Sequence, residues 1–126
     1  MRVISQVIAD QMKKCNINYS KGKKRGKITY PYFVGQIYLL DSGDESGKQE
    51  YELLLDGFDR DPDESKFLED IETIEKAFPA IGGYVFQDRK NLIMISYDTM
   101  IPDIPTDPDV DLNRAQIKLK ITKWRC

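Results

Sequence analysis

Residues 115–122 have the sequence Ala-Gln-Ile-Lys-Leu-Lys-Ile-Thr, in which apolar and polar side chains alternate without a break. A period of two is typical of a β-strand that buries one face and leaves the other in water. Lys118 and Lys120 are therefore predicted to lie on the wet face. The side chains predicted to face the core are Ala115, Ile117, Leu119 and Ile121. Such a strand needs neighbouring strands and an apolar layer over its buried face.

Two β-hairpins are predicted before this strand. Residues 32–40 and 50–58 are rich in β-forming side chains, and the polar segment between them contains two glycines. In the second of these strands the side chains predicted to face the core are Tyr51, Leu53 and Leu55. Residues 84–87 and 92–97 form the second hairpin, joined by a turn at 88–91.

Two amphipathic helices are predicted to cover the sheet. Residues 2–15 have an apolar stripe at helical spacing, made by Val3, Ile4, Val7, Ile8, Met12 and Cys15. The second helix begins at the capping sequence Asp61-Pro62-Asp63-Glu64 and ends at Pro79. Its predicted stripe consists of Phe67, Leu68, Ile71, Ile74 and Phe78.

The predicted order of elements is α-ββ-α-ββ-β over a single domain spanning residues 1–126. This order favours the α+β class, with a mostly antiparallel sheet and two helices packed on one face in a two-layer arrangement. Two segments are predicted to lie outside the regular structure. They are a flexible basic loop at 21–27 and a Pro/Asp-rich loop at 99–111.

Charge is distributed unevenly along the chain. The 126 residues carry a net charge of −2. Residues 1–27 hold eight basic residues and one acidic residue, a net +7, so the remainder carries −9. This separation suits head-to-tail contact between copies, in which a basic part of one copy meets an acidic part of the next.

The chain contains no histidine, which removes the commonest general acid/base and the usual zinc ligand sets. The acidic clusters at 59–64 and 107–111 lack the glycine that a calcium loop requires at its turn. The segment 22–27 has neither the glycine spacing nor the Ser/Thr of a phosphate-binding loop. We therefore expect a protein that is not an enzyme and has no metal or cofactor.

The expected compartment is the cytoplasm of the producing cell. No apolar run is long enough to cross a bilayer, and the first residues do not have the pattern of a secretion signal. Cys15 and Cys126 form neither a metal spacing nor a disulfide framework. No membrane partner is expected.

Direct binding of nucleic acid is an alternative. The basic run at 21–27 and the wet-face residues Lys118 and Lys120 provide charges that could neutralise phosphates. Against it stand a sequence pI of about 5.2 and the lack of aromatic side chains within the basic run. A solvated loop, or one that contacts a protein partner, fits the basic run better.

Two segments carry a resemblance to a known family. Ile28-Thr29-Tyr30-Pro31-Tyr32-Phe33-Val34-Gly35 is followed, after an acidic hairpin loop, by a strand that ends in Gly57-Phe58-Asp59-Arg60. This pair of segments, ahead of an acidic helix, resembles the small tail terminator and minor tail proteins of phages and prophages of Firmicutes. The order of helices and strands is similar to theirs along most of the chain.

The resemblance implies a homo-oligomeric ring, usually of six copies, at the head-proximal end of the virion tail. Such a ring caps the tail tube, stops its polymerisation and joins it to the head connector, with DNA only passing through the lumen. The implied partners are the tube, the sheath and the connector. Alternatives are a head-tail completion protein, another minor tail subunit or a nucleic-acid-binding accessory domain. The candidate contact residues are Lys21, Lys23, Lys24, Arg25, Lys27, Tyr30, Tyr32, Arg60, Asp103, Asp107, Asp109, Lys118 and Lys120.

Overall fold

The computed structural model describes residues 2–22, 29–41, 47–60, 65–101 and 112–125. Two helices and six strands lie in this part of the chain. They follow one another as α1 (Arg2–Lys14), β1 (Tyr19–Lys21), β2 (Tyr32–Asp41), β3 (Lys48–Asp59), α2 (Ser65–Ala77), β4 (Tyr84–Gln87), β5 (Asn91–Ile101) and β6 (Asn113–Arg125). The predicted α+β class is confirmed, and the order contains one strand more than was predicted.

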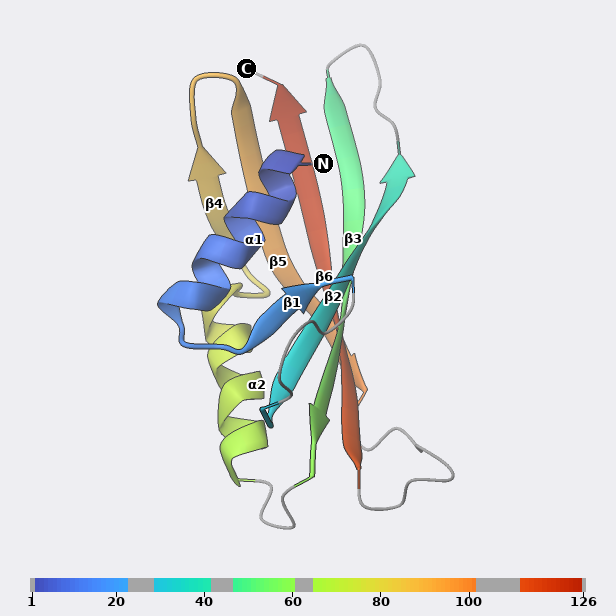
Figure 1. Cartoon of the computed structure of the whole chain (residues 1–126). Helices are drawn as coiled ribbons and strands as arrows, with labels where there is room; N and C mark the ends of the chain where they lie inside the picture. The colour runs from blue at the N-terminus through green and yellow to red at the C-terminus, as the bar shows by residue number, and fades with distance from the viewer. Residues whose placement is uncertain (1, 23–28, 42–46, 61–64, 102–111, 126) are drawn as a thin grey trace.

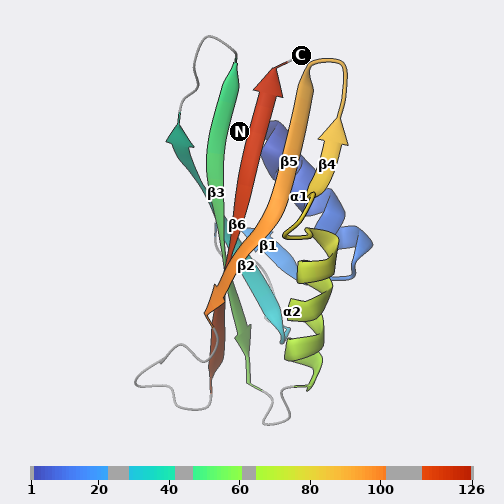
Figure 2. The ribbon, with the colours of Figure 1, turned by 180° about the vertical axis from the view of Figure 1, so that it is seen from behind.

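The strands form one sheet in the order β1-β2-β3-β6-β5-β4. All neighbours are antiparallel except β1 and β2, which run in parallel. Both helices lie on the same side of the sheet, which curls around them as a half-barrel (Figures 1 and 2). The last strand of the chain is thus a central strand of the sheet, and the predicted arrangement of two helices on one face is confirmed.

The pairing of β3 with β6 sets which side chains are buried. Leu53 lies opposite Leu119, and Leu55 lies opposite Ile117. All four side chains are fully buried. Since side chains alternate along both strands, the whole apolar set of each strand falls on the helix side. The predicted core faces of both strands are confirmed.

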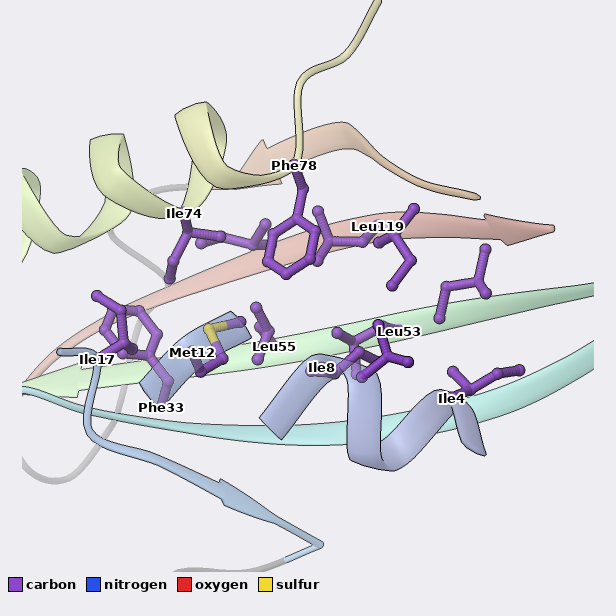
Figure 3. Packing of buried hydrophobic residues seen from close by; sticks show 14 of the residues in the cluster. Ile4, Ile8, Met12, Ile17, Phe33, Leu53, Leu55, Ile74, Phe78 and Leu119 are labelled. Carbon is purple, nitrogen blue, oxygen red and sulfur yellow. The ribbon is translucent and has the colours of Figure 1, made fainter. Parts of the chain in front are cut away.

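Helix α1 packs its apolar stripe against this face. Ile4, Ile8 and Met12 point from α1 toward the strands, on the side from which Ile74 of α2 also points (Figure 3). The helix ends where Asn16 takes a left-handed backbone conformation, with φ of 57°. Asparagine tolerates this conformation better than most residues, and the turn brings the buried Ile17 back under the helix. The predicted helix over residues 2–15 is confirmed to within one residue, since α1 spans Arg2–Lys14.

Helix α2 differs from the prediction at one turn. Phe67, Ile71 and Ile74 are buried as predicted, but Leu68 is 48% exposed and Asp70 is buried instead. Leu68 is rotated away from the stripe that begins at Phe67. Asp70 is tolerated because the Lys66 ammonium lies 2.9 Å from its carboxylate, one turn before it. The predicted cap at 61–64 lies outside the described residues.

The predicted loop at 21–27 begins too early. Residues Tyr19–Lys21 form β1, with Tyr19 opposite Phe33 and Lys21 opposite Gly35. The amide of Phe33 donates a hydrogen bond to the Asn18 carbonyl, 2.8 Å away. The Tyr19 ring passes so close to Gly35 that a Cβ there would lie 2.8 Å from it, so glycine is required for this contact. The other basic candidates of this loop, Lys23, Lys24, Arg25 and Lys27, lie outside the described residues.

The predicted Pro/Asp-rich loop at 99–111 also begins too early. β5 continues to Ile101. A register shift between Tyr97 and Thr99 returns Met100 to a position opposite Ile117, where it packs against the core. A β-bulge of this kind lets a strand continue after one residue falls out of alternation. The remaining candidates of this segment, Asp103, Asp107 and Asp109, lie outside the part of the chain that the structure describes.

Gly57 is predicted to be essential for packing at the lower end of the core. A Cβ at this position would lie 2.5 Å from Phe33 Cε2 and 2.9 Å from Phe67 Cε1. Gly57→Ala should therefore lower the free energy of unfolding by about 1–3 kcal/mol, measured by urea denaturation. In a Phe33→Leu background the same change should cost less. An equal cost in both backgrounds would contradict the steric explanation.

Tyr19 yields a prediction about alkaline stability. Burial raises the pKa of its phenol from 10.0 to about 12, and its hydroxyl has no hydrogen-bond partner among the described residues. The folded chain therefore keeps this proton at a pH where the unfolded chain loses it. The free energy of unfolding should fall, by on the order of 2 kcal/mol, as the pH rises from about 10 to about 12.

In the Tyr19→Phe variant, this contribution to the alkaline fall in the free energy of unfolding should vanish. The variant should be as stable as the wild type near neutral pH, or more stable by about 1 kcal/mol, because an unpaired buried hydroxyl is removed. Urea denaturation of both proteins across the alkaline range measures the difference. Parallel pH profiles would show that Tyr19 does not contribute.

Candidate interaction surface

The face of the sheet opposite the helices has no element packed on it within the described chain (Figure 2). We call it the open face. Its side chains are those that alternate with the buried ones, so each row of core residues has a row of open-face residues beside it. Phe33, Gly57 and Ala115 form a core row. The adjacent open-face row consists of Tyr32, Phe58 and Arg114.

This open-face row continues into a run of stacked rings. The ring of Tyr32 stacks on that of Phe58, with centroids 5.1 Å apart and planes inclined by 26°. The ring of Tyr30 lies 5.5 Å from that of Tyr32 at an inclination of 44°. We call Tyr30, Tyr32 and Phe58 the aromatic ladder. Offset contacts of this kind each contribute about 0.5–1.5 kcal/mol beyond the burial of area.

An arginine flanks each end of the aromatic ladder. Arg60 Nε donates a hydrogen bond to the Tyr30 hydroxyl at 3.0 Å, and its guanidinium lies 5.8 Å from the centre of that ring. At the other end the guanidinium of Arg114 lies 5.7 Å from the centre of the Phe58 ring. Both distances are within the range of a cation–π interaction. The ladder therefore presents cations held in place against aromatic faces.

Asp56 holds the second arginine in place. Its Oδ1 lies 2.9 Å from Arg114 Nη2, and both side chains are about one-third exposed. The same oxygen accepts a weaker hydrogen bond from Gln116 Nε2 at 3.4 Å. Since all of these groups sit on paired strands, their positions follow from the sheet register. The result is a preorganised polar and aromatic surface.

The electrostatics of the ladder keep its central phenol neutral. The pKa of Tyr32 lies above its ordinary value, mainly because burial disfavours the charged form. The neighbouring Tyr30 raises it further, and the guanidinium of Arg60 acts in the opposite direction. Tyr32 therefore remains an uncharged hydrogen-bonding group at neutral pH.

The structure brings together some of the residues that the sequence singled out and separates others. Tyr30, Tyr32 and Arg60 meet in the aromatic ladder. Lys118 and Lys120 lie on the same open face but on β6, opposite Leu54 and Glu52. Lys21 is exposed at the end of β1, on the opposite flank of β2 from β3 and β6.

Phe58, Arg114 and Asp56 are contact residues that the sequence analysis missed. Alternation along β3 could have placed Phe58 and Asp56 together, because Leu55 and Gly57 face the core. No local signal pointed to Arg114. Its position opposite Phe58 follows only from the register between two strands that are far apart in the sequence.

Other surface features offer no evident chemistry. An open hollow of about 760 Å³ lies beside the end of α2, lined by Glu72, Glu75, Lys76, Pro79, Ala80 and Ile81. Within the described ranges there is no group of three or more His, Cys, Asp or Glu residues that could hold a metal ion. Neither helix seen in the structure is long and apolar enough to cross a membrane.

Comparisons with known proteins show the fold but no family. No family model matches the chain, and no curated protein matches it. A solved structure, named only by a sequence identifier, is similar with a TM-score of 0.62 and 11% sequence identity. The similarity covers 91% of this chain and 85% of that chain. At this level of identity the likeness extends to the fold alone.

The contact between Arg60 and Tyr30 is predicted to contribute measurably to stability. Tyr30→Phe, which removes the acceptor and keeps the ring, should lower the free energy of unfolding by about 0.5–1 kcal/mol. The same change in an Arg60→Ala background should have little effect, because the donor is already absent. Urea denaturation of the four proteins of this cycle gives the coupling. A coupling near zero would mean that the hydrogen bond makes no net contribution.

Proposed function

We propose that the protein is a structural subunit of a bacteriophage tail, or of a phage-tail-like particle, that forms a ring on the tail tube. One observation carries the proposal. The two segments that resemble tail terminators, Tyr30-Pro31-Tyr32 and Gly57-Phe58-Asp59-Arg60, are well separated in the sequence yet converge in the aromatic ladder on the open face. The resemblance thus corresponds to one surface of the folded protein.

The composition of this surface supports a role in assembly. Tyrosine and arginine are enriched among the residues that contribute most to protein–protein binding. A side chain held by stacking and hydrogen bonds loses little conformational entropy when it binds, which favours association. Arg60 is exposed, so a partner can reach its guanidinium from solvent. The uneven distribution of charge along the chain also supports contact between copies, because a basic part of one copy can meet an acidic part of the next.

In this proposal the partners are other copies of the chain, the tail tube protein, the sheath and the head connector. The ring, of six copies in the family that the chain resembles, ends polymerisation of the tube and joins the tail to the head. DNA passes through its lumen without specific contact. The location is the head-proximal end of the tail, after synthesis in the host cytoplasm. A head-tail completion protein or another minor tail subunit would use the same kind of surface.

The open face gives less support to nucleic-acid binding. Lys118 and Lys120 lie there, but Lys120 sits opposite Glu52, and Arg114 is paired with Asp56. These carboxylates offset the positive charge that phosphate binding would need. A surface of mixed charge with half-buried rings fits a protein partner better.

The test is a tube-capping assay. Tail tube protein encoded in the same gene cluster is polymerised with and without this protein, and tube lengths and ends are measured by negative-stain electron microscopy. We expect shorter tubes with a ring at one end. Arg60→Ala should raise the concentration needed for capping by about tenfold or more. Arg2→Ala, which removes an exposed arginine from the start of α1, is the matched control and should cap normally.

Two outcomes would count against this function. Tubes of unchanged length with bare ends would overturn the capping role. Binding of DNA that weakens steeply with salt, together with no effect on tubes, would favour the accessory domain instead.

A further inference from the structure

The edge of the sheet at β2 is only partly covered. β1 pairs with Phe33, Val34 and Gly35 and with no later residue of β2. From Gln36 to Asp41, β2 is therefore paired on its β3 side alone within the described chain. The upper part of β2 runs along the outer side of the sheet, beyond the end of β1 (Figure 1).

The backbone groups that point out of this edge can be identified. The Phe33 amide donates to Asn18 O, and Gly35 O accepts from the Gly22 amide, each at 2.8 Å. Residues 33 and 35 thus direct their N–H and C=O groups toward β1. Because these directions repeat every second residue along a strand, Ile37 and Leu39 direct theirs to the same side, above the end of β1. An incoming strand would find donors and acceptors there in the spacing of a sheet.

The side chains of this edge are apolar and exposed. Tyr38 is 44% exposed, Leu39 49% and Leu40 58%. Monomeric proteins usually protect such an edge with lysine, proline or a covering loop, because an unprotected apolar edge pairs with other chains. Residues 36–40 contain neither lysine nor proline. This edge has the character of an interface.

A matching edge lies at the other end of the same sheet. β4 pairs with β5 and is the last strand on that side. Its Val85 is 55% exposed and lies on the open face, as Tyr38 does on β2. Four successive antiparallel pairings separate β2 from β4, so the two strands run in the same direction. The four residues of β4 fit within the bare length of β2.

The two strands end next to different charged residues. β2 ends at Asp41, which lies opposite Glu50 of β3, and the Glu50 carboxylate lies 3.4 Å from the Lys48 ammonium. β4 is followed by a turn. In this turn Asp88 Oδ1 accepts hydrogen bonds from the backbone amides of Lys90 and Asn91, at 2.8 and 2.7 Å. These bonds hold the pKa of Asp88 below its ordinary value. The turn presents Arg89 and Lys90 to solvent.

We propose that β4 of one copy adds to the bare edge of β2 in the next copy as a parallel strand. Val85 would then lie beside Tyr38, on the open face of both copies. The contact is heterologous, so repeating it gives a ring when the rotation closes. The strand pairing is inferred from the properties of the two edges, whereas its closure into a ring rests on the proposed function.

An isologous pairing of β2 with β2 of a second copy would cover one of the two edges only. It would leave β4 bare, with Val85 still exposed. The heterologous contact covers both edges at once, which is why it is the pairing proposed.

The experiment uses one lysine substitution on each edge. Leu39→Lys blocks the β2 edge and Val85→Lys blocks the β4 edge, since lysine on an edge strand opposes pairing. Leu68→Lys is the matched control, because this leucine of α2 is as exposed as Leu39 and lies on neither edge. The three positions are about half exposed, so each variant should retain the fold, checked by circular dichroism and thermal melting. Mass is measured by multi-angle light scattering over a concentration series.

We expect the wild type and Leu68→Lys to form the same oligomer. Leu39→Lys and Val85→Lys should each be monomeric, with self-association weakened at least about 100-fold. An equimolar mixture of these two variants should form a dimer and stop there. Each dimer would pair the intact β4 edge of the Leu39→Lys chain with the intact β2 edge of the Val85→Lys chain.

Hydrogen exchange provides a second readout. The amides of Ile37 and Leu39 should exchange slowly in the wild-type oligomer and rapidly in the Val85→Lys monomer, where the substitution is remote from them. Equal exchange in the two proteins would contradict the pairing.

Four results would overturn the proposal. A wild type that stays monomeric at every concentration excludes the contact, and so do two edge variants that assemble normally. If Val85→Lys assembles while Leu39→Lys does not, β2 pairs with β2. If the mixture remains monomeric, the two edges do not meet. The tube-capping assay is scored separately, so loss of this contact and loss of the proposed function can be told apart.

Discussion

The antiparallel pairing of β3 with β6 is the constraint on which the rest of the structure depends. It runs from Lys48 opposite Trp124 to Asp59 opposite Asn113. The register decides which side chains of the two central strands are buried, and a slip by one residue would turn every one of them to the opposite face. The apolar stripes of α1 and α2 rest on the face that this register creates. The pairing is also non-local, because α2, β4 and β5 lie between β3 and β6 in the sequence.

The same alternation creates the candidate interaction surface. Phe33, Gly57 and Ala115 face the core, and the residues next to them along the strands, Tyr32, Phe58 and Arg114, face outward. One set of strand pairings therefore places Phe33, Gly57 and Ala115 in the core on one face and aligns the aromatic ladder on the other. A change that shifts these strands would be expected to disturb both faces together. The tight contacts around Gly57 fix the strands from the core side while leaving the outward row free to meet a partner.

Strand lengths determine where the sheet is incomplete. β1 is short and covers only the first part of β2, and β4 covers only part of β5. Within the described part of the chain, β4 and the later part of β2 have no strand on their outer sides, and such edges can pair with strands of other chains. Both edges run in the same direction and carry exposed apolar side chains, so one kind of contact can cover both. This feature of the fold agrees with the proposed role in assembly and is independent of the sequence resemblance that suggested it.

Sequence periodicity was sufficient to predict the elements and their buried faces. The alternation at 115–122, the stripes of both helices and the two hairpins are local patterns, and each is confirmed except at Leu68, which is exposed on α2. Predictions failed where a neighbour distant in the sequence decides the outcome. β1 forms because Gly35 leaves room for Tyr19, and β5 extends because a bulge returns Met100 to a position opposite Ile117 of β6. The burial of Asp70 is a local exception, because the Lys66 ammonium that pairs with it lies one helical turn away.

By itself, therefore, the sequence determined the fold class, the core faces and the grouping of Tyr30, Tyr32 and Arg60 as candidates. Only the tertiary structure decided the strand order, the meeting of Phe58 with Arg114 and the two bare edges. The physical reason is that hydrophobic periodicity is a property of a few neighbouring residues. Strand order and register depend instead on pairing between segments that the sequence separates by tens of residues.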